Sequence, residues 1–311
     1  MNSAIARLLK ISLRLQRPLL RRISHPQQLG LTQAIMTRAA ILPAQASARR
    51  SMMAGVPVLE IRNLRTDHRP GHALVYVHGG GFASGSPDTH RAFAARLMQA
   101  GRFESVFMPQ YRLAPAHPWP AALDDVQAFW SALMQAQPQT VLALAGESAG
   151  ANLCLSLCLR ARDTQSRLPE KIYLHSPWLD VSLSGDSYVD PALEDGFTGR
   201  RRSRRDWIHQ VFARHYAGAS DPRHPHMSPV FADMHGLPPL YVQTGAKELF
   251  LDDSRTLQAN CHAAGTVCEL EVWPGMWHAF ALLAPLLPEA NRAIRHAGRW
   301  LAGDSAVRGE A

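Results

Sequence analysis

The chain carries the sequence VLALAGESAG at residues 141–150. Its first five residues are apolar and typical of a buried strand, whereas residues 151–160 have the composition of a helix. Between them, residues 146–150 fit the pattern G-x-S-x-G, a sharp strand-to-helix turn that exposes a nucleophilic serine. The two glycines suit such a turn, because its flanking backbones approach each other closely. The pattern also arises by chance in unrelated proteins, but the flanking strand and helix favour Ser148 as a nucleophile.

Strand-like and helix-like segments alternate on both sides of this motif. The alternation indicates an α/β fold with a mostly parallel central sheet and helices on both faces. The 311 residues, 46% of them hydrophobic, are enough to bury a large core and exclude a small disulfide-stabilised or disordered protein. Strands are expected at residues 56–64, 73–77, 105–108, 141–145, 172–175, 240–244 and 268–272.

Two segments interrupt the alternation and predict a helical cap. Residues 4–48 show helical spacing of apolar residues, and residues 182–227 contain no convincing strand. The second segment repeats apolar residues on one side of a helix from Trp207 to Tyr216. The expected division is an N-terminal helical cap segment at 1–53, a catalytic domain at 54–181 and 228–303, a cap insertion at 182–227 and a tail at 304–311.

A glycine-rich loop follows the expected strand at residues 73–77. It reads His78-Gly79-Gly80-Gly81-Phe82 and leaves backbone N–H groups without side chains to shield them. Such donors can stabilise the oxyanion that forms when an ester carbonyl is attacked. The alternative is a phosphate-binding turn, but the loop lacks both the Lys-Ser/Thr of a P-loop and the spacing of a dinucleotide site.

A serine nucleophile needs a base and an acid, and α/β-hydrolases carry them in the order serine, acid, histidine. The acids Glu248, Asp252 and Asp253 follow the expected strand 240–244, and His278 follows the strand 268–272. Both groups therefore come at the carboxyl edge of the sheet. A buried histidine without a catalytic role is the alternative for His278, but its loop position after the last strand favours a base.

Further motifs identify a family. The chain resembles the hormone-sensitive-lipase-like family of bacterial α/β-hydrolases, which are carboxylesterases with HGGGF and GxSAG motifs. The resemblance extends from about residue 56 to 301, in an order that makes it specific. The matching blocks are HGGGF at 78–82, YRLAP at 111–115, HPWPAALDD at 117–125, GESAG at 146–150, SPWLD at 176–180, LPP at 237–239 and GM at 275–276.

The resemblance implies roles for individual residues. It implies Ser148 as the nucleophile and His278 as the base. Backbone N–H groups of three residues would form the oxyanion hole: Gly80, Gly81 and Ala149. No metal or other cofactor is implied.

The acid of the triad is less directly given by the family pattern. That pattern has Asp-Pro-Leu, with a second Asp four residues after the first. Here Glu248 stands four residues before Asp252, so Glu248 is the expected acid, with Asp252 as the alternative.

The same resemblance implies that the N-terminal helices and the 182–227 insertion cover Ser148. Phe82, Trp207 and Phe212 are the expected substrate-pocket residues, although ordinary cap packing would also account for the helix that holds the last two. The predicted activity is hydrolysis of short to medium acyl carboxylic esters through an acyl-enzyme. Lactone or formamide hydrolysis and a non-catalytic ligand receptor of the same fold are the alternatives.

The net charge of +8 is unevenly distributed along the chain. Residues 1–58 hold nine Lys and Arg and no Asp or Glu. This segment is a solvated helix face, a transit-like presequence, or a peripheral contact with anionic membranes. The arginine cluster at 200–205 lacks base-reading motifs, so we expect no nucleic-acid partner.

The remaining partners and the location are expected from what the sequence contains. No apolar stretch is long enough to span a bilayer, and no secretion signal is recognisable, which favours the cytoplasm. Cys154 and Cys158 stand four apart, but no ligand pair accompanies them at zinc spacing. A small-molecule ester is the expected partner of the chain, which would act as a monomer or a homodimer.

Overall fold

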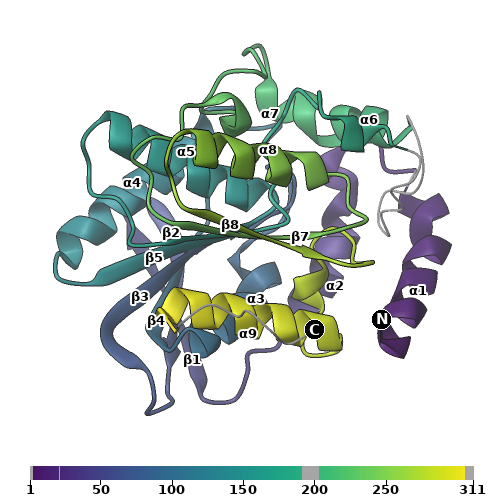
Figure 1. The fold of residues 1–311 in the computed structure, drawn as a ribbon. Helices are drawn as coiled ribbons and strands as arrows, with labels where there is room; N and C mark the ends of the chain where they lie inside the picture. The colour runs from purple at the N-terminus through teal and green to yellow at the C-terminus, as the bar shows by residue number, and fades with distance from the viewer. Residues whose placement is uncertain (1–2, 21, 191–202, 305–311) are drawn as a thin grey trace.

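The computed structural model describes residues 3–20, 22–190 and 203–304. Its centre is an eight-stranded sheet with the strand order β1-β2-β4-β3-β5-β6-β7-β8 (Figure 1). The strands are β1 (Ala46–Met53), β2 (Val56–Asn63), β3 (Arg69–Val77), β4 (Phe103–Pro109), β5 (Val141–Glu147), β6 (Ile172–His175), β7 (Leu240–Gly245) and β8 (Cys268–Trp273).

Most neighbouring strands of this sheet are parallel. β2 pairs antiparallel with both β1 and β4, and all the pairs from β4 to β8 are parallel. Parallel neighbours need crossover connections, which the helices supply. The carboxyl ends of β3, β5, β7 and β8 consequently lie at the same edge of the sheet. The glycine-rich loop, the G-x-S-x-G motif, Glu248 and His278 lie in the segments at this edge.

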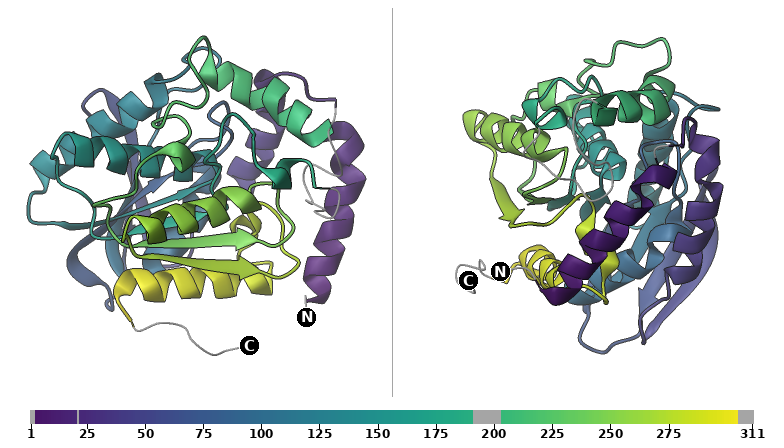
Figure 2. Two further views of the ribbon diagram at one scale, coloured as in Figure 1. Left: turned by 45° about the horizontal axis from the view of Figure 1, so that its top comes forward. Right: turned by 90° about the vertical axis from the view of Figure 1, so that its right-hand side faces the viewer.

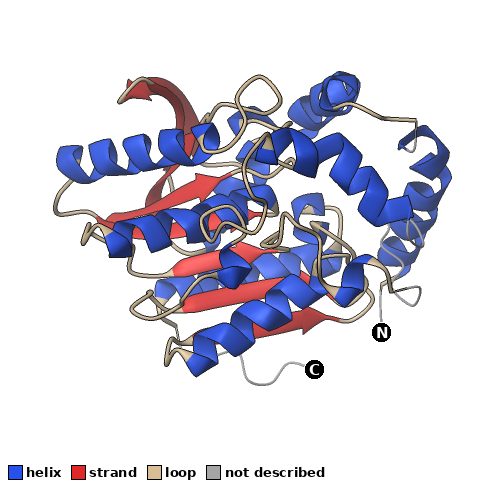
Figure 3. Ribbon diagram, turned by 90° about the horizontal axis from the view of Figure 1, so that it is seen from above, coloured by secondary structure: helices blue, strands red, loops and turns tan. Residues whose placement is uncertain are grey.

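Helices cover both faces of the sheet. On one face lie α4 (Ala121–Ala136), α5 (Ala149–Asp163) and α8 (Leu251–Ala263), and on the other lie α3 (Pro87–Ala100) and α9 (Pro288–Ala302) (Figures 1 and 3). Each set packs on its own buried apolar cluster. This arrangement confirms the predicted α/β fold with helices on both faces of a mostly parallel sheet.

The N-terminal segment and the cap insertion lie on the same side of the molecule (Figures 1 and 2). The N-terminal segment forms α1 (Ala4–Leu20), a short 3-10 turn at Pro26–Leu29 and α2 (Gly30–Ala39). The insertion forms α6 (Ser203–Ile208), a π-helical turn at His209–Ala213 and α7 (Arg214–Ala217). The indole N–H of Trp207 donates a hydrogen bond to the carbonyl of Ile23, which ties the two segments together.

The structure departs from the expected elements at the N-terminal segment. Helices were expected up to residue 48, but α2 ends at Ala39 and residues 46–53 form β1. The sequence of β1, ASARRSMM, has no apolar alternation, and its residues are mostly exposed. Main-chain pairing with β2 along its whole length creates this strand, and a hydrophobicity pattern does not report such pairing.

All seven expected strands are present, with bounds close to the predicted ones. The helix expected from Trp207 to Tyr216 is continuous in space but contains the π-helical turn. Part of the predicted cap insertion, residues 191–202, lies outside the described residues, as do 305–311 of the predicted tail. The division into cap and catalytic segments remains a prediction.

Candidate active site

Ser148 stands at the turn between β5 and α5, as the motif predicts. Its backbone has φ 54° and ψ −119°, a strained conformation for a residue other than glycine. Its N–H donates to the carbonyl of His175 at 3.0 Å. Gly150 has to lack a side chain, because a Cβ there would lie 2.1 Å from the carbonyl oxygen of Val77. The start of α5 therefore packs closely against the end of β3, and this packing helps to hold Ser148 in its strained backbone conformation.

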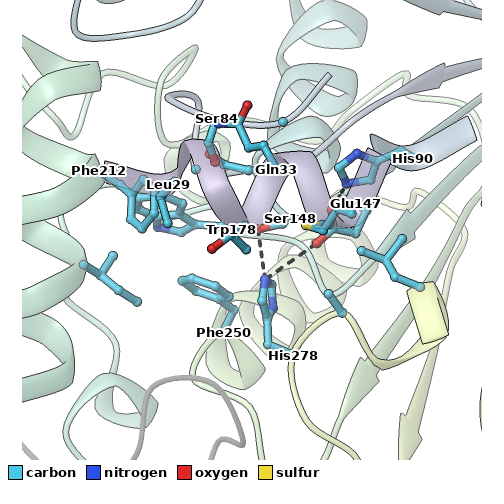
Figure 4. Close-up of a pocket in the computed structure, with 18 of the residues that line it drawn as sticks. Leu29, Gln33, Ser84, His90, Glu147, Ser148, Trp178, Phe212, Phe250 and His278 are labelled. Atoms are coloured by element: carbon cyan, nitrogen blue, oxygen red, sulfur yellow. Dashed lines mark hydrogen bonds and ion pairs between the residues drawn. The ribbon is translucent and has the colours of Figure 1, made fainter. Parts of the chain in front are cut away.

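His278 lies between Ser148 and Glu248. Its Nε2 is 3.1 Å from Oγ of Ser148, and its Nδ1 is 2.9 Å from Oε2 of Glu248. Figure 4 shows the imidazole of His278 directed at the serine. Three residues from distant parts of the chain therefore form one hydrogen-bonded series at the carboxyl edge of the sheet.

The second carboxylate oxygen of Glu248 is bound to its own strand end. It accepts hydrogen bonds from the hydroxyl of Thr244 and from the N–H of Gly245. Asp252, the alternative acid, instead accepts from the N–H of Ser187 at 2.6 Å and pairs with Arg255. The structure brings Glu248 to His278, whereas Asp252 contacts Ser187, near the start of the predicted cap insertion.

Two further contacts orient His278. The Phe250 ring meets the imidazole edge to face, with 4.8 Å between the ring centroids. The N–H of Ala279, the next residue, donates to Oγ of Ser176 at 3.1 Å. The sequence assigned no role at the site to Phe250 or to Ser176 of the SPWLD block, because only the folded loops bring them to the histidine.

A cavity of about 210 Å³ opens beside Ser148 and His278 (Figure 4). Its walls come from the glycine-rich loop, the N-terminal helices and the cap insertion. Gly80 and Gly81 lie in its wall. Its other lining residues include Leu29, Thr32, Gln33, Met36, Trp178, Trp207, Ile208, Phe212, Leu249, Phe250 and Leu282.

The predicted site residues fall into three groups around this cavity. Trp207 and Phe212 line it, as expected. Ala149 is buried as the first residue of α5, so its N–H is among those without a partner inside that helix. Phe82 was expected in the pocket, but it is fully buried outside the lining and stacks on Tyr216, with centroids 3.6 Å apart. Tyr216 belongs to α7 of the cap insertion, so a cap side chain covers the face of the Phe82 ring.

A buried acid and a buried histidine line the cavity in addition to the predicted residues. Oε2 of Glu147 is 3.3 Å from Nε2 of His90, and Oε1 of Glu147 is 3.7 Å from Nε2 of His278. Glu147 occupies a variable position of the G-x-S-x-G pattern, which says nothing about its chemistry. His90 is on α3, and no sequence signal connects it to the serine.

Burial and charge set the protonation of these groups. Burial alone would raise the pKa of Glu147, but the hydrogen bond and charge of His90 and the charges of His278 and His175 lower it below its usual value. Burial lowers the pKa of His175 to about 4 and that of His78 to about 3. Glu147 is therefore a carboxylate at neutral pH, whereas His78 and His175 are neutral.

Residues 74–282 match the family described as alpha/beta hydrolase fold. The chain is 30% identical, with a TM-score of 0.87, to a solved esterase from the bacterial hormone-sensitive lipase family, over 98% of this chain and 99% of that one. The chain belongs to this family of carboxylesterases. Two curated relatives agree with the assignment. An acetyl-hydrolase of Streptomyces hygroscopicus is 37% identical over 76% of this chain and 78% of its own length.

The second relative of this carboxylesterase is the putative acetyl-hydrolase LipR of Mycobacterium tuberculosis. It is 35% identical over 87% of this chain and 85% of its own length. Within the described residues of the carboxylesterase, we find neither a helix suited to crossing a membrane nor a group of three metal-binding side chains.

Proposed function

We propose that the enzyme hydrolyses carboxylic esters through a covalent acyl-enzyme on Ser148. The serine oxygen attacks the ester carbonyl while Nε2 of His278 takes its proton and passes it to the departing alcohol. The same nitrogen then takes a proton from the water that attacks the acyl-enzyme, and it returns that proton to the serine oxygen as the acid is released. Glu248 orients the imidazole and stabilises its charged form, and the N–H groups of Gly80, Gly81 and Ala149 hold the oxyanion.

One observation carries this proposal. His278 hydrogen-bonds at one nitrogen with Ser148 and at the other with Glu248, and the serine opens on an apolar cavity. A base that is itself oriented by an acid is the arrangement that activates a serine. All three side chains belong to one chain, so the proposed chemistry needs no second copy.

We expect esters with short to medium acyl chains as substrates. The apolar walls contributed by Phe212, Trp207 and Leu29 favour an alkyl chain over a charged one. Two curated relatives are acetyl-hydrolases by name, which supports the short end of the range. The cavity volume of about 210 Å³ also suits a small substrate.

The test is a hydrolysis profile over p-nitrophenyl esters from acetate to laurate, with lactones and formamides assayed beside them. We expect the highest kcat/KM among the short and medium esters. Ser148→Ala should reduce hydrolysis by about 10⁶-fold, as removal of the nucleophile does in other serine triads. Retained turnover in this variant would refute the proposed mechanism.

Two alternatives are separated by the same profile. A preference for lactones or formamides would keep the triad and change the substrate class. A receptor of the same fold would bind small ligands without turnover. We favour the enzyme because Ser148, His278 and Glu248 are all present and His278 is hydrogen-bonded to both of the others.

We also propose that α1 makes a peripheral contact with anionic membranes. Ile5, Leu8 and Ile11 are 43%, 67% and 51% exposed and stand three apart, so they lie along one side of the helix. Ala6 is buried against the body of the protein. Together with the acid-free basic sequence of residues 1–58, this exposed apolar side resembles an interfacial helix. A cytoplasmic location stays a prediction from the sequence.

Vesicle sedimentation tests this contact. We expect the protein to sediment with phosphatidylglycerol-containing vesicles, less so at high salt, and not with pure phosphatidylcholine vesicles. The double variant Leu8→Ser/Ile11→Ser should lose the binding. Val267→Ser, which removes an equally exposed side chain on the loop before β8, should retain it. Equal sedimentation of the wild type with both kinds of vesicle would contradict the proposal.

A further inference from the structure

Glu147 places a buried carboxylate directly beside the reacting groups. Its side chain is 4% exposed and lies 3.7 Å from Nε2 of His278, the nitrogen that takes the serine proton in the proposed mechanism. Nε2 of His90 holds its other oxygen at 3.3 Å (Figure 4). Charged carboxylates are rarely buried without a partner, because their removal from water is energetically costly. A carboxylate in this position needs an explanation beyond packing.

The carboxylate also supports the glycine-rich loop. A Cβ on Gly79 would lie 2.0 Å from Oε2 of Glu147, so the loop passes over the carboxylate at a position where only glycine fits. His78, the preceding residue, is stacked on Tyr111, with centroids 4.3 Å apart. Glu147 is therefore enclosed between the loop, α3 and His278, and its distance from the imidazole is set by backbone packing.

The triad already contains an acid for His278. Glu248 binds Nδ1, whereas Glu147 approaches Nε2 from the opposite edge of the ring. At 3.7 Å the second approach is too long for a hydrogen bond but close enough for strong electrostatic attraction in a buried site. This attraction is strongest when the imidazole is positively charged, which happens as the serine proton is transferred.

We propose that Glu147, held in place by His90, is a positioning residue that stabilises the charged form of His278 during catalysis. The inference rests on the proposed triad and adds a second carboxylate to it. Glu147 touches no reacting atom in this scheme. It acts through the imidazole, and its removal should change the pH dependence of the reaction as well as its rate.

Apart from Glu248, the other titratable groups described here around Glu147 and His278 carry no negative charge at neutral pH. His175 faces both carboxylates and His278, but burial keeps it neutral, with a pKa of about 4. The charge of Glu147 also acts on three buried tyrosines, Tyr76, Tyr111 and Tyr173. Burial raises the pKa of each phenol well above its usual value, so all three stay neutral. His78, beside His90, is neutral as well. Among the described residues, the carboxylates that form an ion pair with His278 at 4 Å or less include Glu147 and Glu248.

The test is the pH profile of kcat/KM for p-nitrophenyl butyrate with Glu147→Gln. The amide keeps the shape and removes the charge. We expect the acid limb to move to lower pH by about one unit, because the imidazolium loses a nearby negative charge. At the plateau, kcat should fall about tenfold, which is the same electrostatic loss in the transition state. KM should change little.

Three further variants separate electrostatics from structure. Glu147→Asp keeps the charge and should keep the acid limb near its wild-type position. Glu60→Gln neutralises an equally buried carboxylate on β2, bound to Arg49 and Arg62, and should leave the limb unmoved. If the single variant does not fold, Glu147→Gln/His90→Gln removes the same charge and lets two amides pair. Thermal melting shows which variants are folded.

The outcomes are distinct. A folded Glu147→Gln enzyme with a wild-type acid limb would overturn the inference and leave Glu147 a support of the glycine-rich loop only. A limb that shifts equally in Glu147→Asp would also overturn it. Absence of ester hydrolysis by the wild type would instead refute the proposed function. The wild-type assay therefore separates a failure of the proposed function from a failure of this inference.

Discussion

Glu248 binds His278 with one carboxylate oxygen and the end of its own strand with the other. The distance from Oε2 to Nδ1 of the imidazole is 2.9 Å, and Oε1 accepts the N–H of Gly245 at 2.6 Å. Both oxygens thus have a hydrogen-bond partner in a fully buried site. Glu248 reaches the histidine from the turn that follows β7.

The first prediction ranks the two acids after β7. Glu248→Gln should lower kcat/KM by about 10³–10⁴-fold, because a neutral amide cannot stabilise the imidazolium or enforce its tautomer. Asp252→Asn should cost far less, since Asp252 contacts Ser187 and Arg255 and not the histidine. Steady-state kinetics with p-nitrophenyl acetate provide the measurement. The opposite ranking would assign the acid to Asp252.

The second prediction concerns acyl-chain selectivity. Phe212 lines the cavity, and its ring packs directly against Gly81. A Cβ on Gly81 would lie only 2.4 Å from Cδ1 of that ring. Phe212→Ala should enlarge the acyl space and raise the ratio of kcat/KM for octanoate over acetate esters several-fold. A hydrolysis profile across p-nitrophenyl esters measures this ratio.

Phe82→Leu is the matched control for Phe212. Phe82 is buried outside the cavity against Tyr216, so its truncation should lower the melting temperature and leave the octanoate-to-acetate ratio unchanged. A changed ratio in Phe82→Leu with none in Phe212→Ala would reverse the placement of the two rings.

The third prediction is a loss of stability in mild acid. Burial lowers the pKa of His175 to about 4 and that of His78 to about 3, against 6.5 in the unfolded chain. Below pH 6.5 the unfolded chain therefore binds more protons than the folded one, so the free energy of unfolding falls as the pH drops toward 4. Urea denaturation at pH 7 and pH 5 should show this decrease.

A variant checks that these histidines cause the effect. His175→Gln removes one of the two groups and should flatten the decrease between pH 7 and pH 5, where most carboxylates keep their charge. An unchanged slope in His175→Gln would attribute the acid sensitivity to other groups. A flat wild-type profile would contradict the prediction itself.

Local sequence patterns predicted much of this architecture. The runs around residues 73–77, 141–145 and 240–244 are apolar because parallel strands are buried on both faces, and such runs are recognisable without a structure. The nucleophile motif and the glycine-rich loop depend on tight backbone turns, which leave glycines at fixed spacing. The order of catalytic residues along α/β-hydrolase chains then pointed to Glu248, after the strand at 240–244, and to His278, after the strand at 268–272. The sequence therefore identified Ser148, Glu248 and His278 as candidates before their distances were known.

Tertiary structure alone decided how side chains distant in the sequence meet. It brought Glu248 and not Asp252 to His278, placed Phe82 in the core against Tyr216 and outside the cavity lining, and made residues 46–53 a strand by pairing them with β2. It also brought Glu147 and His90 beside His278. Turns and strands follow from local backbone sterics and burial, which adjacent residues encode. The environment of a buried charge depends on groups from several elements, and only the packed chain brings those groups together.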